Sequence, residues 1–120
     1  MTNAKPAVAV LGPGRLGRTL AAALEGAGYR VRLASSRVVE EAQDAVDASD
    51  VAFLTVPDAA IGGVAAVVEW RPGQLVAHCS GARGLEVLAV AEQVGALIGC
   101  LHPLQSFPSE PDATRFAGIT

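Results

Sequence analysis

A glycine-rich loop near the start of this 120-residue chain is the segment best suited to binding a ligand. It reads Gly12-Pro13-Gly14-Arg15-Leu16-Gly17, the G-x-G-x-x-G pattern that joins a strand to a helix. In that pattern the first glycine makes a tight turn, the second admits a pyrophosphate, and the third lets helix and strand approach. We therefore predict that residues 12–17 bind a dinucleotide, chiefly through the Arg15 and Leu16 amides, since Pro13 has no N–H.

A second polar turn, Ser35-Ser36-Arg37, bears on which dinucleotide is bound. NAD-binding domains usually carry a carboxylate there, roughly 20 residues after the loop, to bind the ribose 2′-hydroxyl. Two hydroxyls and a guanidinium, with no carboxylate to repel an anion, favour a 2′-phosphate and hence NADP(H). The missing acid also argues against an S-adenosylmethionine methyltransferase. The alternative is that Ser36 caps the next helix and Arg37 is solvated.

The segment Thr55-Val56-Pro57 completes the predicted cofactor site. It follows a strongly apolar run, and ligands of open α/β sheets lie at the carboxyl ends of the strands, so its backbone could line a ribose. Asp58 directly precedes a helical run and is expected to be its N-cap. The pair Gly62 and Gly63 is expected only to permit close packing between helix and sheet.

Alternating strands and helices are predicted to position these loops. Short aliphatic runs indicate strands at 7–11, 30–34, 51–56, 75–79 and 96–101. Helical spacing predicts helices from the glycine loop to about Ala27, with a stop at Gly28, and at 38–46, 58–70 and 85–94. The pattern predicts an α/β fold with one domain over residues 1–120. Its doubly wound parallel sheet and glycine loop indicate an NAD(P)-binding Rossmann fold.

The composition excludes several classes of protein. Nine Lys and Arg against twelve Asp and Glu give a net charge of −3, with no basic block that could bind nucleic acid. The apolar stretch 59–68 is far shorter than the ~20 residues of a membrane span, and residues 1–11 lack the apolar core of a signal peptide. We expect a cytoplasmic protein in which Cys79 and Cys100 stay reduced.

Several of these segments together resemble a known family. They are GPGRLG at 12–17, SSR at 35–37, LTVPD at 54–58, HCSGA at 78–82 and GCLHPLQSF at 99–107. They are similar to the Rossmann-like proteins with a C-terminal domain of unknown function, DUF2520, which are NADP-dependent oxidoreductases. The first domain of that family is similar to those of pyrroline-5-carboxylate reductase and the F420-dependent NADP oxidoreductases. The resemblance spans almost the whole chain.

The resemblance implies a second, mostly helical domain that completes the active site and forms a homodimer. This chain lacks that domain, so we expect it to be the N-terminal half of a longer enzyme, able to bind a cofactor without turnover. The implied reaction is hydride transfer between NADP(H) and a small-molecule substrate with a carbonyl or imine group. The alternative is a non-catalytic NADP(H)-binding sensor or scaffold module.

The candidates for catalysis are Ser80 and His102. The stretches His78-Cys79-Ser80 and His102-Pro103 follow neighbouring predicted strands, so their side chains could converge at a nicotinamide ring. The second stretch resembles the HP-containing loop of prephenate dehydrogenases, which implies that Ser80 and His102 orient and polarise the substrate. The alternatives are a His102 that only hydrogen-bonds in a Pro-rich turn and a buried His78 satisfied by backbone.

A metal site is not expected at these residues. The spacing of His78, Cys79, Cys100 and His102 matches no ordinary zinc motif, and neighbouring residues of a strand point to opposite faces. Cys79 and Cys100 are better explained as small buried hydrophobic residues on adjacent strands.

Overall fold

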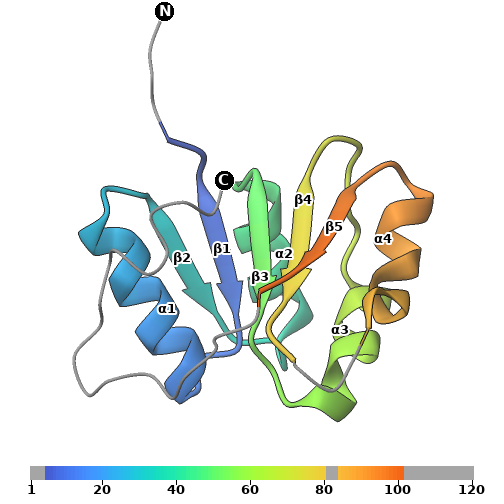
Figure 1. Ribbon diagram of the computed structural model, residues 1–120, viewed down its shortest axis with the longest axis horizontal. Helices are drawn as coiled ribbons and strands as arrows, with labels where there is room; N and C mark the ends of the chain where they lie inside the picture. Colours follow the sequence, from blue (N-terminus) through green and yellow to red (C-terminus); the bar gives the residue numbers. More distant parts are fainter. Residues whose placement is uncertain (1–4, 81–83, 102–120) are drawn as a thin grey trace, which may run out of the picture.

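Short aliphatic runs form one five-stranded parallel sheet in the computed structural model, which describes residues 5–80 and 84–101 (Figure 1). The strands β1 and β3 lie at its centre and are buried at every position, as expected for a sheet covered on both faces. The order across the sheet is β2-β1-β3-β4-β5, so the predicted α/β fold with a doubly wound parallel sheet is confirmed. The strands are β1 (Val8–Leu11), β2 (Val31–Ala34), β3 (Val51–Leu54), β4 (Leu75–His78) and β5 (Leu97–Cys100).

Helices cover the two faces of the sheet unequally (Figure 1). Of the helices that the structure describes, only α1 (Arg15–Gly26) packs on one face, where Leu20 and Leu24 meet Val10 and Phe53. The opposite face carries α2 (Val39–Asp47), α3 (Ile61–Val67) and α4 (Ala89–Gln93) over a separate aliphatic core. Within the described ranges, no helix is both long enough and apolar enough to span a bilayer.

The predicted helices 58–70 and 85–94 are each shorter and begin with a 3₁₀ turn. These turns are η1 (Asp58–Ala60), which precedes α3, and η2 (Leu85–Leu88), which precedes α4. Glycine costs about 1 kcal/mol in a helix interior, so Gly62 and Gly63 weaken α3 from its start. Trp70 lies beyond α3, and its indole Nε1–H donates to the Ala65 carbonyl at 2.9 Å, which satisfies a carbonyl of the last helical turn.

The order of the strands determines where a site can form. The chain leaves β1 toward β2 on one side, then returns past β1 to β3 on the other, so β1 and β3 are neighbours with oppositely directed connections. Loops that diverge in this way leave a crevice at the carboxyl ends of the strands. At the far end of α1, Gly28 has φ +96°, which confirms the predicted glycine stop.

Candidate functional site

A pocket of about 390 Å³ lies where the loops after β1, β2 and β3 meet. Each loop contributes three consecutive residues, and all of them were predicted to contact a cofactor. The remaining predicted residues, Arg15, Leu16 and Gly17, form the first turn of α1 beside the pocket. The lining residues are Gly12, Pro13, Gly14, Ser35, Ser36, Arg37, Thr55, Val56 and Pro57.

The three glycines of the loop have different surroundings. Gly12 has φ +115°, and a Cβ on Gly17 would lie 1.9 Å from the Gly12 carbonyl oxygen, so both positions require glycine for the fold itself. A Cβ on Gly14 would meet no atom within 4 Å. Gly14 therefore has no packing reason to be glycine, and the open space beside it is where the fingerprint places a pyrophosphate.

The start of α1 offers backbone donors to this pocket. Its first helical hydrogen bond runs from the Arg18 amide to the Gly14 carbonyl at 2.9 Å, and no side chain caps the helix. The amides of Arg15, Leu16 and Gly17 therefore precede the helical ladder. The first turn contains no acidic residue. An anion is the ligand that this positive helix end would attract.

Thr55, at the end of β3, is hydrogen-bonded to the glycine loop through its side chain. Its hydroxyl lies 2.9 Å from the carbonyl oxygen of Gly12 and 3.1 Å from that of Leu11, and the residue is buried. Only a backbone role was predicted for Thr55. The one sequence signal for the side-chain role is a hydroxyl that directly follows an apolar strand.

The turn after β2 is closed by its own side chain. The Arg37 amide donates to Ser35 Oγ at 3.1 Å, and the Arg37 side chain is exposed. The alternative role of Ser36 as a helix cap is wrong, because the N-cap of α2 is Val38 and no side chain caps that helix. Ser36 is thus left to line the pocket.

Two expectations for the segment after β3 are also wrong. Pro57 occupies the N-cap position with ψ 149°, so Asp58 is already the first residue of η1 and makes no capping hydrogen bond. A Cβ on Gly62 or Gly63 would meet nothing within 4 Å, so neither glycine is needed for close packing against the sheet.

A second, apolar pocket of about 380 Å³ adjoins the first. Ser36, Arg37, Val56 and Pro57 line both pockets. Its other residues come from η1 and α3. None of them was predicted, because the rotation of α3 about its axis decides which of its residues face the turn after β2. These residues are Ala60, Gly63, Val64 and Val67.

The polar groups of His78 and Ser80, at the end of β4, are hydrogen-bonded within the domain. His78 is completely buried, its Nε2–H donates to the Gly84 carbonyl at 2.8 Å, and its Nδ1 accepts from the Ser80 amide at 3.0 Å. The interpretation of His78 as a buried histidine satisfied by backbone is confirmed. Ser80 is also buried and lines neither pocket, and the Cys100 thiol donates to its carbonyl at 3.5 Å. His102 lies outside the described residues.

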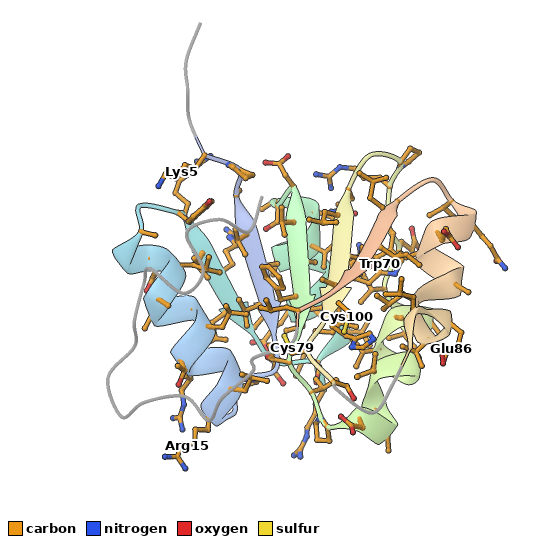
Figure 2. The ribbon with its side chains drawn as sticks, in the orientation of Figure 1. Lys5, Arg15, Trp70, Cys79, Glu86 and Cys100 are labelled. Atoms are coloured by element: carbon orange, nitrogen blue, oxygen red, sulfur yellow. The ribbon has the colours of Figure 1, made fainter. Side chains whose placement is uncertain are left out.

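The two cysteines lie near the same edge of the sheet (Figure 2). Burial, together with the nearby Cys100, raises the pKa of the Cys79 thiol from 9.0 to about 12, and burial also raises the pKa of Cys100. Cys79 is buried as predicted, whereas Cys100 is half-buried with its sulfur 3.7 Å from His78 Nδ1. Among the residues that the structure describes, no three His, Cys, Asp or Glu side chains are grouped to hold a metal ion.

Comparison with known proteins identifies a domain family. The sequence model of the Rossmann-like domain matches residues 29–103, which is more than half of the chain. The match begins after the glycine loop, so the loop and this family match are independent observations. No curated protein sequence matches the chain.

Solved structures of imine reductases share the fold. One from Aspergillus terreus, in complex with NADPH4 and dibenz[c,e]azepine, has a TM-score of 0.66 at 15% identity, over 82% of this chain and 41% of its own. A variant from Myxococcus stipitatus in complex with NAD+ has a TM-score of 0.63 at 24% identity, over 78% and 38%. One from Bacillus cereus has a TM-score of 0.59 at 18% identity, over 78% and 39%. The chain thus spans about two fifths of the length of these proteins.

Proposed function

This chain belongs to the Rossmann-like domain family, and we propose that it is the NADP(H)-binding part of a cytoplasmic oxidoreductase acting on a small carbonyl or imine compound. The observation that carries this proposal is the pocket formed jointly by the loops after β1, β2 and β3. The nicotinamide cofactor, when bound, supplies or accepts the hydride. The protein has to hold and orient it.

The pocket fits the phosphates of such a cofactor. Open space beside Gly14 gives a pyrophosphate access to the backbone, and the amides that start α1 supply hydrogen bonds. On the side of β2, the exposed Arg37 and the hydroxyls of Ser35 and Ser36 supply charge and donors for a 2′-phosphate. These groups make NADP(H) the proposed cofactor.

The adjoining apolar pocket fits the base that is joined to the phosphorylated ribose of the dinucleotide. Its walls are the aliphatic side chains of Val56, Val64 and Val67 and the bare backbone of Gly63. Planar heteroaromatic rings bind well between apolar walls and a guanidinium, which Arg37 provides. The pair of pockets therefore accommodates a base joined to a phosphorylated ribose.

The catalytic roles of Ser80 and His102 remain proposals. We propose that they orient the substrate carbonyl or imine once the rest of the enzyme is present. We also propose that a further, helical domain completes the site and that the whole protein is a homodimer. The lengths of the imine reductases, about twice that of this chain, support a larger protein.

A second candidate function is favoured by the internal hydrogen bonds at the end of β4. His78 and Ser80 are buried, and the ring nitrogens of His78 and the amide of Ser80 are hydrogen-bonded within the domain. A protein that binds NADP(H) as a sensor or scaffold needs no side chains that reach a substrate. Cofactor binding without oxidation of NADPH by any compound in a broad carbonyl and imine panel, with the full-length protein, would favour this function.

Titration of the chain with NADPH and NADH in parallel tests the proposed cofactor. NADPH should bind more tightly, and Arg37→Ala should weaken it by about 1.5–3 kcal/mol, the usual contribution of a hydrogen bond to a charged group. NADH binding should hardly change, because NADH lacks the 2′-phosphate. A preference for NADH, or equal loss of both cofactors in Arg37→Ala, would contradict the proposal.

A further inference from the structure

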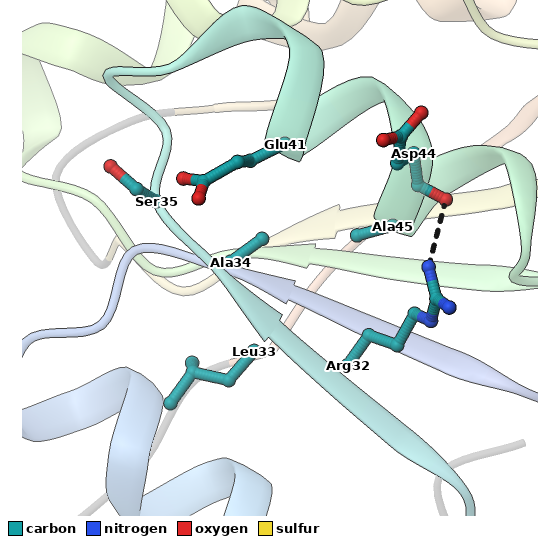
Figure 3. A pocket seen from close by; sticks show the side chains of 7 residues that line it. All are labelled: Arg32, Leu33, Ala34, Ser35, Glu41, Asp44 and Ala45. Carbon is teal, nitrogen blue, oxygen red and sulfur yellow. Dashed lines mark hydrogen bonds between the residues drawn. The ribbon is translucent and has the colours of Figure 1, made fainter.

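A groove of about 380 Å³ runs between β2 and α2, on the outer side of the sheet (Figure 3). Because β2 is an edge strand, no further strand of the described sheet lies beyond it. Ser35 lines both this groove and the proposed cofactor pocket, so the two hollows meet at its side chain. The groove is lined by Arg32, Leu33, Ala34, Ser35, Glu41, Asp44 and Ala45.

The charges in this groove are unevenly placed. The carboxylate of Glu41 points along the groove toward Ser35 (Figure 3). Arg32, the only cation among the lining residues, lies at the other end, where its Nη1 donates to the backbone carbonyl of Asp44 at 3.5 Å. The end that meets the cofactor pocket therefore carries a negative charge without a neighbouring lining cation. The turn Ser35-Ser36-Arg37 itself contains no carboxylate, but the first turn of α2 that follows it contributes Glu41 to the same groove.

We propose that Glu41 is a specificity-determining residue that limits the preference of this site for NADPH over NADH. The inference rests on the proposed function. A 2′-phosphate at Ser35 carries nearly two negative charges, which the Glu41 carboxylate repels, whereas the 2′-hydroxyl of NADH is neutral. Arg37 attracts the phosphate and Glu41 opposes it, so the affinity ratio of the two cofactors is set by both side chains.

Glu41 also has an ordinary role that any test must separate from this one. Glu40 and Glu41 both lie in the first turn of α2, where acidic residues interact favourably with the helix dipole. Glu40 does not line the groove. The substitution Glu40→Gln is therefore a matched control, because it removes the same charge from the same helical turn. Asp44→Asn removes a charge from the same groove, about one turn farther from Ser35.

The experiment is a titration of wild type, Glu41→Gln, Glu40→Gln and Asp44→Asn with NADPH and with NADH at low ionic strength. Glu41→Gln should raise the ratio of NADPH to NADH affinity about three- to tenfold, as expected for removal of a nearby like charge. Asp44→Asn should have a smaller effect and Glu40→Gln less than about a twofold effect. Salt near 1 M should shrink the difference, because it shortens the Debye length to about 3 Å.

The possible failures are distinguishable. If wild type binds neither cofactor, or if Arg37→Ala does not weaken NADPH selectively, the proposed function fails and the inference fails with it. If wild type binds NADPH and Arg37→Ala behaves as expected, but Glu41→Gln leaves the ratio unchanged or shifts it no more than Glu40→Gln, only the role of Glu41 is overturned. Chemical denaturation of each variant shows whether helix stability changed equally.

Discussion

The carboxyl ends of β1 to β3 and the end of β4 lie along one edge of the same sheet, yet they differ in their polar groups. Those near the first three ends leave room for a ligand, whereas those at the end of β4 are already hydrogen-bonded within the domain. The first three loops line a pocket beside the uncapped start of α1, and Gly14 has open space beside its Cα. After β4, both ring nitrogens of His78 are bonded to backbone, and the amide and carbonyl of Ser80 are used within the domain.

This difference distinguishes the loops proposed to bind the cofactor from the segment proposed to act in catalysis. The cofactor half of the edge has spare hydrogen-bonding capacity before any ligand arrives, which is the arrangement that a binding site requires. At the end of β4, the polar groups of His78 and Ser80 are already hydrogen-bonded within the domain. The comparison would be sharpened by substitutions after β4 that change only the stability of the domain and by substitutions in the β1 to β3 loops that change only cofactor affinity.

The largest expected effect is at His78. His78→Ala should lower the free energy of unfolding by about 4 kcal/mol, because it leaves a cavity in place of a completely buried side chain and removes the hydrogen-bond partner of the buried Ser80 amide. NADPH affinity should be nearly unchanged. Urea denaturation and cofactor titration of the same variant measure the two quantities. His78→Gln, which retains a donor, should recover part of the stability, and a stable His78→Ala variant would break the comparison.

Gly17→Ala should come next, at about 3 kcal/mol of stability. Its Cβ would lie 1.9 Å from the backbone oxygen of Gly12 and 2.6 Å from Thr55 Oγ1, so the loop or the helix must move. Thermal unfolding measures this loss. An unchanged melting temperature would show that the loop is more adaptable than its packing indicates.

Gly14→Ala is the complementary test on the same loop. Its Cβ meets no atom within 4 Å, so stability should stay within about 0.5 kcal/mol of wild type. Cofactor affinity should fall at least about tenfold, or ~1.4 kcal/mol, because the methyl group occupies the approach to the pyrophosphate. Retained affinity would mean that the phosphates bind elsewhere.

The smallest effect concerns pH and Cys79. The folded thiol has a pKa of about 12 against an ordinary 9.0, so above pH 9 the unfolded chain loses a proton that the folded chain keeps. Stability is therefore unaffected below pH 9 and falls above it, by at most ~1.4 kcal/mol per pH unit. Denaturation at pH 8 and pH 10 measures the fall. Cys79→Ala should reduce it, and an equal fall in that variant would assign it to other groups.

The strands and the pocket loops could be predicted because they depend on local patterns. Aliphatic runs fixed the strands to within two residues of their observed ends. Turn residues after three of those runs identified all the residues that line the proposed cofactor pocket. Parallel strands bring their carboxyl ends to one edge of the sheet. The loops that follow them can therefore be predicted to form one site from the sequence alone.

The features that were missed depend on conformation through space. The hydrogen bond from the Arg37 amide to Ser35 closes the turn before α2 starts, so the cap falls on Val38, an aliphatic residue that no capping rule selects. Pro57 takes the cap position that was expected for Asp58. The approach of Glu41 to Ser35 depends on how α2 is rotated against β2, which the spacing of apolar residues fixes only coarsely.

The contact between Thr55 and the glycine loop has a consequence for the entropic cost of binding. Its buried hydroxyl ties the loop after β1 to the end of β3 through the domain's own hydrogen bonds. A loop that is already ordered loses little conformational entropy when a ligand arrives, so more of the contact energy remains as affinity. Removal of this tether by Thr55→Val should therefore appear as a larger entropic cost of binding, with the phosphate contacts themselves unchanged.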